Sequence, residues 1–411
     1  MYNEQNIDCM SDLEKAFICQ HRGDDVTTLL LQKERYADVD VQKMAVQISA
    51  WQTACKKLPL WAATDGICYP VHLSMEQCSS QAAGAYKGRL AARLLEGVEQ
   101  PLVMDLTGGF GVDCTMMMRH LQRGRLIYVE RNEELCALAR HNLPLLGVER
   151  ADVVQGNGEQ QLDRVGHADL VFADPARRDA HGGKTVRIAD CTPDVTELVP
   201  RMARRGGLMM VKLSPMLSIS DARQQLAVEG YGVSEVHVVS IEGECKELLL
   251  VLSDTNGCRT FCVNIAHGST QEFVFTEAEE REAVCEYASR PERYLYEPNA
   301  SLLKGGAYKS LAARLGLRKL HPNSHLYTSE VWCEAFPGRA FEISDYASFN
   351  KKELKHLLAG LKKANLTVRN FPMTVADLRK RLKLGEGGMD YLFATTLADE
   401  AHVLLRCRKT S

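Results

Sequence analysis

The residues best suited to chemistry are an acid and a glycine-rich turn at the end of an expected strand. Asp105 closes an apolar run, the turn Thr107–Gly111 follows it, and the next segment, Val112–Leu121, has the pattern of a helix. A second apolar run ends at Glu130, nineteen residues after Gly111. Glycines let the backbone approach a ligand closely, and an acid after the second strand can accept hydrogen bonds from both hydroxyls of a ribose. The spacing predicts a nucleotide-binding βαβ unit.

Three classes of cofactor use a glycine turn of this kind. A phosphate-binding loop needs the pattern Gly-x4-Gly-Lys-Ser/Thr, and no Lys follows Gly111. A nicotinamide dinucleotide prefers G-x-G-x-x-G, with its pyrophosphate at a helix N-terminus. Here Asp105 precedes the glycines, and its carboxylate would repel a pyrophosphate but suits the ammonium group of S-adenosylmethionine, directly or through water. The acid therefore favours S-adenosylmethionine as the cofactor.

Length and composition set the outer limits. The chain has 411 residues, of which 45% are hydrophobic and 25% charged, and its net charge is −3. These values predict a soluble globular protein of two or three domains. No run approaches the roughly 18 apolar residues of a membrane helix, and Met1–Gln5 does not resemble an export signal, so we expect a cytoplasmic location.

The cysteine pattern bears on metal binding. The 14 cysteines include no Cys-x-x-Cys pair. In an intracellular chain this distribution predicts buried thiols, with neither a disulfide framework nor a metal site. Cys191 and Cys245 lie near the expected sheet edge but lack the sequence context of cysteine-dependent methyltransferases, so we expect both to be structural.

Strands alternate with helices between residues 96 and 255, as a mostly parallel sheet requires. Val233–Ile241 and Lys246–Leu252 are separated by a short turn and predict a terminal antiparallel hairpin, which the dinucleotide fold lacks. The five strands expected before the hairpin are Leu102–Leu106, Arg125–Glu130, Ala151–Gln155, Leu170–Ala173 and Leu208–Leu213.

The flanking regions have different patterns. Residues 1–95 are expected to be mainly helical, with a capping box at Ser11 and Glu14. Val41–Lys56 has apolar residues at helical spacing, and the segment Ser74–Leu95 is expected to end in a helix that leads to the glycine-rich turn. Residues after 256 predict an α+β appendage. Its expected helices are Glu277–Ala288, Ala307–Leu315, Asn350–Ala364 and Thr374–Leu384, and its expected strands are Ala340–Ile343, Leu366–Asn370, Tyr391–Thr396 and His402–Cys407.

Residues 96–255 resemble the class I S-adenosylmethionine-dependent methyltransferases. Asp105–Gly111 looks like the family's first motif, with Thr107 where glycine is common, and Asn157 stands where an Asp usually meets the adenine amine. Asp174–Arg177 looks like the Asp/Asn-Pro-Pro-aromatic motif at the catalytic mouth, although Arg177 replaces the aromatic residue. The cofactor-binding residues that the resemblance implies are Asp105, Thr107, Gly108, Gly109, Gly111, Glu130 and Asn157.

Further segments narrow the resemblance to a bacterial methyltransferase family with a THUMP-like C-terminal domain. The segments that carry it are Glu76–Ser80, Asp174–Asp179, Gly182–Thr185, Asp190–Asp194, Met210–Met216, Cys245–Leu249 and His321–His325. The resemblance implies an α/β fold, a Rossmann-like sheet ending in an antiparallel hairpin. It also implies an N-terminal helical region over 1–95, a methyltransferase domain over 96–255, a ferredoxin-like domain over 256–335 and a THUMP-like domain over 336–411.

Several polar residues are candidates for holding the substrate. The carboxylate of Asp174 and the carbonyl of Pro175 could accept hydrogen bonds from an exocyclic base amine, and Arg177 could stack on a base or hold a phosphate. Arg178, Lys184 and Lys212 are candidate substrate contacts. The alternative interpretations are a loop cap for Asp174, solvated surface charges for Arg177 and Arg178, and an ordinary mobile loop for the segment that contains Lys184.

The C-terminal region carries a local positive charge that favours RNA as the partner. Between Lys351 and Lys383 there are ten Lys or Arg residues and two acids. Such a strip suits a phosphate backbone, although a solvated helical face has the same composition. We therefore expect a methyltransferase acting on a base in RNA. The alternatives are a methyltransferase for a small molecule or protein, a cofactor-binding RNA adaptor without catalysis, and, least favoured, a dehydrogenase.

Overall fold

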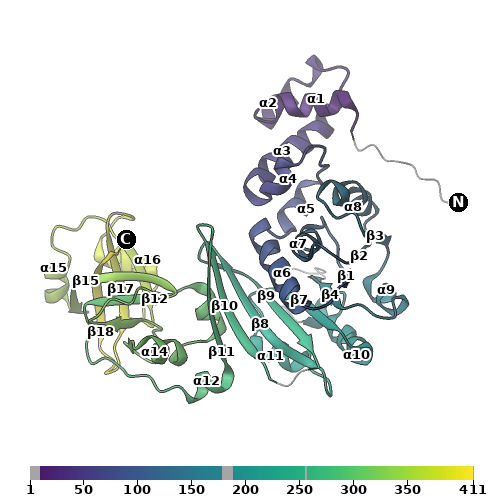
Figure 1. Ribbon diagram of the computed structural model, residues 1–411. Coiled ribbons are helices and arrows are strands. Elements are labelled where there is room, and N and C mark those ends of the chain that lie inside the picture. Colours follow the sequence, from purple (N-terminus) through teal and green to yellow (C-terminus); the bar gives the residue numbers. More distant parts are fainter. Residues whose placement is uncertain (1–9, 178–187, 255–256, 411) are drawn as a thin grey trace. The chain divides into compact units, whose positions relative to one another are not determined.

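The computed structural model describes residues 10–177, 188–254 and 257–410 (Figure 1). The chain forms two compact units, one of Met1–Ser234 with Leu249–Asn256 and the other of Glu235–Leu248 with Gly257–Ser411. None of the helices in the described ranges is both long and apolar enough to cross a bilayer.

A nine-stranded sheet has the order β11-β10-β8-β9-β7-β4-β1-β2-β3. Its strands β1, β2, β3, β4 and β7 are parallel. A two-residue turn joins β8 to β9, and both of its residues, Glu242 and Gly243, have positive φ, as a tight hairpin turn requires. The predicted Rossmann-like sheet ending in a hairpin is confirmed. These strands are β1 (Leu102–Asp105), β2 (Arg125–Glu130), β3 (Ala151–Gln155), β4 (Leu170–Ala173), β7 (Leu208–Leu213), β8 (Gly232–Ile241) and β9 (Glu244–Ser253).

Two further strands extend this sheet, although their residues were expected to begin the ferredoxin-like domain. β10 (Arg259–Ala266) pairs in parallel with β8, and β11 (Ser269–Thr276) pairs antiparallel with β10. Phe261, Cys262 and Val263 of β10 are buried. Three consecutive buried residues do not give the simple alternation of a half-buried strand, which explains why the sequence did not predict β10.

The N-terminal helices pack against the glycine-rich turn. Trp61 and Tyr69 share a hydrophobic core with Phe110 of the turn and with Val112 and Met116. The capping box of Ser11 and Glu14 is confirmed. The helices are α1 (Asp12–His21), α2 (Val26–Leu31), α3 (Val41–Lys57), α4 (Pro59–Ala63), α5 (His72–Gln77) and α6 (Gln81–Leu94).

The helix expected at the end of Ser74–Leu95 is present as α6, and an extended segment separates it from α5. Cys78 and Ser80 have extended backbone conformations there. The Ser80 hydroxyl accepts a hydrogen bond from the backbone N–H of Ala83, at 3.3 Å, and so caps α6. A serine side chain that satisfies a free helix N–H favours a new helix start over a continuous helix.

Helix α6 lies close to α7 (Val112–Leu121) because it presents glycines to it. A Cβ atom at Gly88 would lie 2.5 Å from the carbonyl oxygen of Met116, and one at Gly84 would lie 3.0 Å from the Met116 side chain. This close approach brings the side chains of α6 to the start of α7, directly after the glycine-rich turn.

The methyltransferase sheet is connected by four more helices and a small ribbon. The ribbon pairs Ala176 with Thr192 and Arg177 with Cys191. These elements are α8 (Glu133–Leu145), α9 (Gly158–Arg164), α10 (Val195–Arg205), α11 (Ile219–Gln225), β5 (Ala176–Arg177) and β6 (Cys191–Thr192).

The second unit contains a seven-stranded sheet with the order β13-β14-β12-β15-β18-β17-β16. The four strands predicted after residue 336 are present, whereas β12, β13, β14 and helix α13 were not predicted. The strands are β12 (Tyr294–Pro298), β13 (Arg318–Lys319), β14 (Tyr327–Ser329), β15 (Gly338–Ser348), β16 (Asn365–Arg369), β17 (Asp390–Thr396) and β18 (His402–Lys409), and the helices are α12 (Glu277–Glu282), α13 (Ala300–Gly305), α14 (Lys309–Leu315), α15 (Lys351–Leu357) and α16 (Val375–Leu382).

Helices α12, α15 and α16 are shorter than predicted, and α15 and α16 cover one face of this sheet. Leu354 of α15 and Leu378 of α16 share a core with Leu392 and Leu404 of the strands. The neighbouring strand residue Phe393 belongs to a different core, as expected when alternate side chains face opposite sides. The exposed surfaces of both helices therefore belong to the same side of the unit.

Candidate active site

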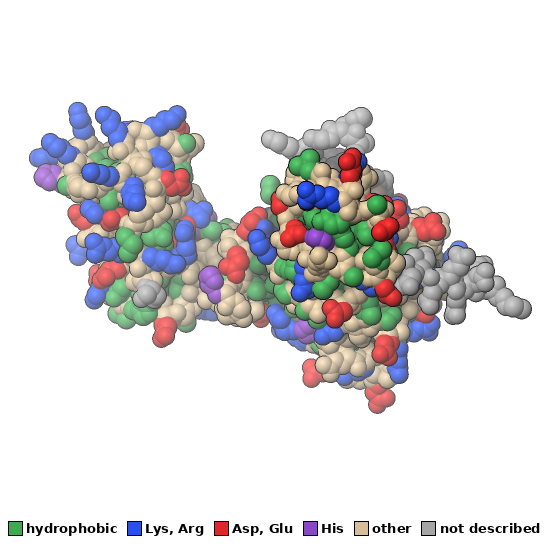
Figure 2. Space-filling model, turned by 90° about the horizontal axis from the view of Figure 1, so that it is seen from above, with side chains coloured by type: hydrophobic (Ala, Val, Ile, Leu, Met, Phe, Trp, Pro, Cys, Tyr) green, Lys and Arg blue, Asp and Glu red, His purple; other side chains and the backbone are tan. Residues whose placement is uncertain are grey.

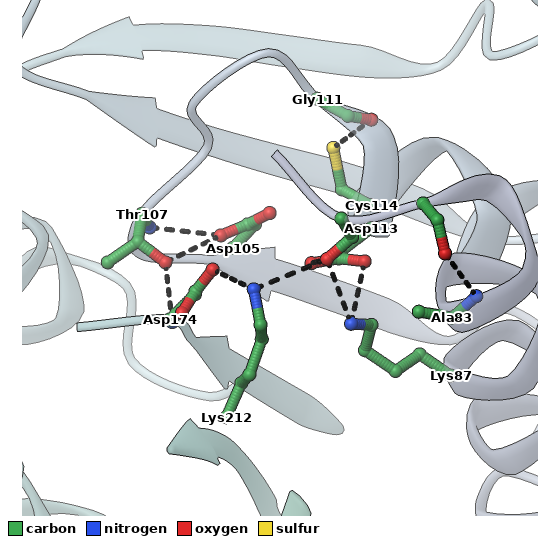
Figure 3. A network of polar contacts seen from close by, with 11 residues as sticks. Ala83, Lys87, Asp105, Thr107, Gly111, Asp113, Cys114, Asp174 and Lys212 are labelled. Atoms are coloured by element: carbon green, nitrogen blue, oxygen red, sulfur yellow. Dashed lines mark hydrogen bonds and ion pairs between the residues drawn. The ribbon is translucent and has the colours of Figure 1, made fainter. Parts of the chain in front are cut away.

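The carboxyl ends of three neighbouring parallel strands bring the main polar residues together. Asp105 ends β1, Asp174 follows β4, and Lys212 lies near the end of β7 (Figure 3). The strand order places β4 between β1 and β7. Open α/β sheets bind their ligands at this edge, so these residues define the candidate site.

The glycine-rich turn is shaped by close contacts with β2. A Cβ atom at Gly108 would lie 2.1 Å from the Tyr128 ring, so only glycine fits there. Gly109 and Gly111 have φ values of +54° and +78°, in the left-handed region that favours glycine. The backbone N–H of Gly109 donates to the carboxylate of Glu130, at 2.9 Å. The predicted ribose acid thus lies against the predicted cofactor loop.

Asp105 is a buried carboxyl with unusual electrostatics. Asp105 is only 1% exposed. Its carboxylate accepts hydrogen bonds from the backbone N–H and the hydroxyl of Thr107, at 2.9 and 3.3 Å. Burial raises the pKa of Asp105 to about 7, and the Asp113 and Asp174 carboxylates act in the same direction, while the Thr107 N–H opposes them. A cationic ligand group would relieve this cost.

Thr107 links two of the loops that form the site. Its hydroxyl oxygen accepts a hydrogen bond from the backbone N–H of Asp174, at 2.7 Å, and its hydroxyl donates to Asp105. Thr107 therefore fixes the loop after β4 relative to the loop after β1. This bracing role was not predicted, since the sequence indicated only a place in the cofactor loop.

Asn157 lies where the third strand leads into α9. It occupies the N-cap position of α9, but its side chain makes no capping hydrogen bond. A Cβ atom at the next residue, Gly158, would lie 2.6 Å from the carbonyl oxygen of Leu106. The start of α9 is therefore held close to the end of β1, near the glycine-rich turn.

Asp174 and Lys212, predicted as an acceptor-positioning residue and a substrate contact, form an ion pair with each other. The distance from Lys212 Nζ to Asp174 Oδ2 is 2.6 Å, and the two side chains are 16% and 36% exposed. Pro175 follows Asp174 and leads into β5, which ends at Arg177. The predicted substrate contacts Arg178 and Lys184 lie outside the described residues.

Comparisons with known proteins agree with this geometry. The chain is 35% identical to a candidate methyltransferase from Porphyromonas gingivalis W83 with a solved crystal structure, with a TM-score of 0.85 and 100% coverage of both chains. It is 27% identical over 319 residues to an uncharacterized S-adenosylmethionine-dependent methyltransferase of Mycobacterium tuberculosis H37Rv, covering 76% of this chain and 81% of that one. Family models match residues 294–337 as a ferredoxin-like domain and residues 338–409 as THUMP domain-like.

The chain belongs to the class I S-adenosylmethionine-dependent methyltransferases with a THUMP-like C-terminal domain. The family resemblance predicted from the sequence is thereby confirmed, as are the methyltransferase class and its cofactor.

Three polar residues of the methyltransferase site were not predicted as functional. Lys87 of α6 is completely buried, and its ammonium lies 3.0 Å from Asp113 Oδ1 and 3.0 Å from the Ser79 hydroxyl oxygen. Ser79 donates to Asp113, at 2.8 Å, and accepts from Lys212, at 3.3 Å. Ser79, Lys87 and Asp113 thus extend the Lys212–Asp174 pair into the interior.

The electrostatic balance of this cluster favours charge on Asp113. Burial alone would raise the pKa of Asp113, but the Lys87 and Lys212 ammonium groups and the hydrogen bonds from Lys87 and Ser79 hold it below its ordinary value. One signal in the sequence could have revealed the cluster: Lys87 stands on the glycine- and alanine-rich face of α6, where a solvated lysine would not be expected.

Cys191 and Cys245, the two cysteines expected near the sheet edge, lack the surroundings of a reactive thiol. Cys191 is buried, and burial raises the pKa of Cys245 to about 11, whereas a reactive cysteine needs a lowered pKa. Within the described parts of the chain, no group of three or more His, Cys, Asp or Glu side chains could hold a metal ion.

Proposed function

We propose that this methyltransferase transfers the methyl group of S-adenosylmethionine to a base in RNA. The observation that carries the cofactor site is the buried carboxyl of Asp105, whose hydrogen-bonding neighbours Thr107 and Cys114 are uncharged groups. Its charged neighbours Asp113 and Asp174 each have a lysine partner, whereas none of the described lysines pairs with Asp105. A ligand ammonium group would supply the missing positive charge.

The remaining cofactor contacts follow from the loops around Asp105. Glu130 would accept hydrogen bonds from the ribose, and the side chain of Asn157 would meet the adenine amine. The glycine-rich turn, with Thr107, Gly108, Gly109 and Gly111, would let the backbone approach the cofactor closely. When bound, the cofactor supplies an electrophilic methyl group on a sulfonium, so the protein mainly has to align the acceptor atom and exclude water.

Asp174 and the Pro175 carbonyl would position the acceptor. An exocyclic amine of a base needs hydrogen-bond acceptors that hold its N–H groups and direct its lone pair toward the methyl group. Oδ2 of Asp174 is taken by Lys212, while Oδ1 makes no hydrogen bond within the described residues. Arg177, Arg178 and Lys184 belong to the segment that follows, where we propose contacts with the substrate.

The exposed cations of the THUMP-like domain support RNA as the substrate. Of the ten basic residues between 351 and 383, Arg369 pairs with Glu297, and Arg379 donates to the carbonyls of Ala364 and Gly385. The other eight are exposed, and Figure 2 shows Lys and Arg side chains gathered on this unit, at its upper left. They are Lys351, Lys352, Lys355, Lys362, Lys363, Lys380, Arg381 and Lys383.

Because the exposed faces of α15 and α16 lie on one side of the domain, the cations of these two helices can act on one phosphate backbone together. Cofactor carrying a radiolabelled methyl group should label total RNA from cells that lack the protein, and nuclease should remove the label. Label that appears in protein or in small molecules instead would show that these molecules, and not RNA, are the substrate. RNA binding without any transfer of label would identify a non-catalytic adaptor. Mass spectrometry of nucleosides from cells with and without the protein would then identify the modified base.

A further inference from the structure

A buried ion pair lies behind the pair of Lys212 and Asp174. Lys87 is 0% exposed and its partner Asp113 is 8% exposed. Taking two charges out of water is costly, and well-packed apolar side chains often stabilise a fold equally well or better. The position of this pair next to the catalytic mouth therefore points to a role beyond stability.

Ser79 connects the buried pair to the catalytic mouth. Its hydroxyl has one proton, which it donates to Asp113, so its oxygen can only accept from other groups. It accepts from Lys87, at 3.0 Å, and from Lys212, at 3.3 Å. The hydroxyl proton of Ser79 therefore points toward Asp113. The contacts with Asp113 and Lys87 together fix the orientation of the lone pairs on the Ser79 oxygen.

The Lys212 ammonium contacts two oxygens of this network. One is the Ser79 hydroxyl, which the buried pair fixes, and the other is Oδ2 of Asp174. Asp174 is in turn held at its backbone N–H by Thr107. If the Lys212 side chain rotated freely, the Asp174 carboxylate could turn with it. The contacts of Lys212 with Ser79 and with Asp174 restrict this rotation.

We propose that Ser79, supported by Asp113 and Lys87, is a positioning residue that orients the Asp174 carboxylate through Lys212. The N-terminal region therefore contributes to methyl transfer although none of these three side chains needs to touch the cofactor or substrate. The inference rests on the proposed role of Asp174 as the residue that positions the acceptor.

The neighbouring serine offers a matched control. Ser80 caps α6 with its hydroxyl and takes no part in the cluster. Ser79→Ala and Ser80→Ala each remove one hydroxyl from the same break between α5 and α6. A purely structural role would make the two variants alike in activity, whereas a positioning role separates them.

Kinetics with radiolabelled cofactor and total RNA test the proposal. We expect Ser79→Ala to lower kcat roughly tenfold or more, as loss of a hydrogen bond to a charged group would, with KM for the cofactor within about twofold of wild type. Ser79→Thr, which keeps a hydroxyl, should recover most of the rate, and Ser80→Ala should keep it. In a Lys212→Met background, Ser79→Ala should cost less than about twofold, because its effect passes through Lys212.

Unchanged kcat in Ser79→Ala, an equal loss in Ser80→Ala, or the full loss retained in the Lys212→Met background would each overturn the proposal. A second measurement does not depend on the substrate. In the full chain labelled with 15N-lysine, the half-buried and hydrogen-bonded Lys212 ammonium should give an NMR signal, assigned by its loss in Lys212→Met. Ser79→Ala should abolish that signal, and Ser80→Ala should preserve it.

The two measurements separate the failure of the inference from the failure of the proposed function. If wild-type protein labels no RNA but the Lys212 signal depends on Ser79, the RNA substrate is wrong and the positioning network stands. If the Lys212 signal is missing from the wild type or survives Ser79→Ala, the network is wrong whatever the substrate.

Discussion

At the scale of single residues, the polar cluster at the ends of β1, β4 and β7 combines the carboxylates of Asp105, Asp113 and Asp174 with the ammonium groups of Lys87 and Lys212. Lys87 pairs with Asp113 and Lys212 pairs with Asp174, which leaves Asp105 without a cationic partner among the described residues. Burial accordingly raises the pKa of Asp105 to about 7. The methionine ammonium of the cofactor would complete the balance of charge, and binding should then displace the proton of Asp105.

This displacement makes cofactor affinity depend on pH. Below pH 7 Asp105 carries a proton that the bound ammonium group opposes, so affinity should fall as pH falls, by up to about tenfold per pH unit. Calorimetry between pH 5 and 7 should show this trend, with proton release revealed by buffers of different ionisation enthalpy. Above that range the α-amino group of the cofactor begins to lose its own proton, with an ordinary pKa of about 7.7–8.0.

Two substitutions at Asp105 give the comparison. Asp105→Ala should abolish cofactor binding within the range of calorimetry, and Asp105→Asn should leave a weak affinity without proton release. Wild-type affinity in Asp105→Ala, or proton release that persists in Asp105→Asn, would contradict the assignment of Asp105 to the cofactor ammonium.

Asp174 should affect turnover and spare cofactor binding. Asp174→Ala removes the acceptor-positioning carboxylate, and we expect the rate of methyl transfer to fall by roughly 10²- to 10⁴-fold with little change in cofactor affinity. Asp152→Ala is the control, since Asp152 forms an exposed ion pair with Arg125 on the same sheet. Normal turnover in Asp174→Ala would show that the catalytic mouth lies elsewhere.

At the scale of elements, the turn between β1 and α7 has no room for a side chain at residue 108. The Tyr128 ring of β2 fills the space where a side chain at residue 108 would lie, and the Tyr128 hydroxyl donates to the carbonyl of Gly109, at 2.5 Å. These contacts hold the turn against β2 and its last residue, Glu130.

Gly108→Ala should disturb the packing of this turn against β2. The added methyl group would overlap the Tyr128 ring, so we expect the free energy of unfolding to fall by roughly 1–3 kcal/mol and cofactor affinity to weaken. Gly166→Ala is the control, because a Cβ atom there meets nothing within 4 Å. Thermal unfolding and calorimetry of both variants test this, and equal behaviour of the two would mean that Tyr128 moves aside without cost.

The sequence predicted the parts of the site that depend on local spacing. Strand ends, glycines and acids follow one another within β1, β2 and their turn, so Asp105, Glu130 and helix α7 could be located from residue order alone. The cluster of Ser79, Lys87 and Asp113 depends instead on the close approach of α6 to α7. It also depends on the break between α5 and α6, where Ser80 caps the start of α6. Such packing between elements leaves no periodic signal in the sequence.

At the scale of the whole molecule, the proposed chemistry and the proposed RNA contacts belong to different units. The cofactor loops and the cluster around Asp174 lie within the first unit, and α15 and α16 with their exposed cations lie in the second. Variants in the second unit should therefore change RNA affinity without changing cofactor affinity.

Lys351 and Lys352 offer the sharpest test of this separation. They stand in the first turn of α15, where the helix dipole disfavours positive charge, so replacing them should not destabilise the helix. If both contact phosphates, Lys351→Ala/Lys352→Ala should weaken binding of a short fluorescein-labelled RNA of mixed sequence. The dependence of log Kd on log salt should also decrease by roughly 1.4–1.8, at about 0.7–0.9 for each lost contact. The double variant Lys33→Ala/Lys56→Ala removes the same charge from exposed positions in the first unit and should leave RNA binding unchanged. An unchanged salt slope in the Lys351/Lys352 variant, or equal weakening in the control, would show that these lysines do not dock RNA.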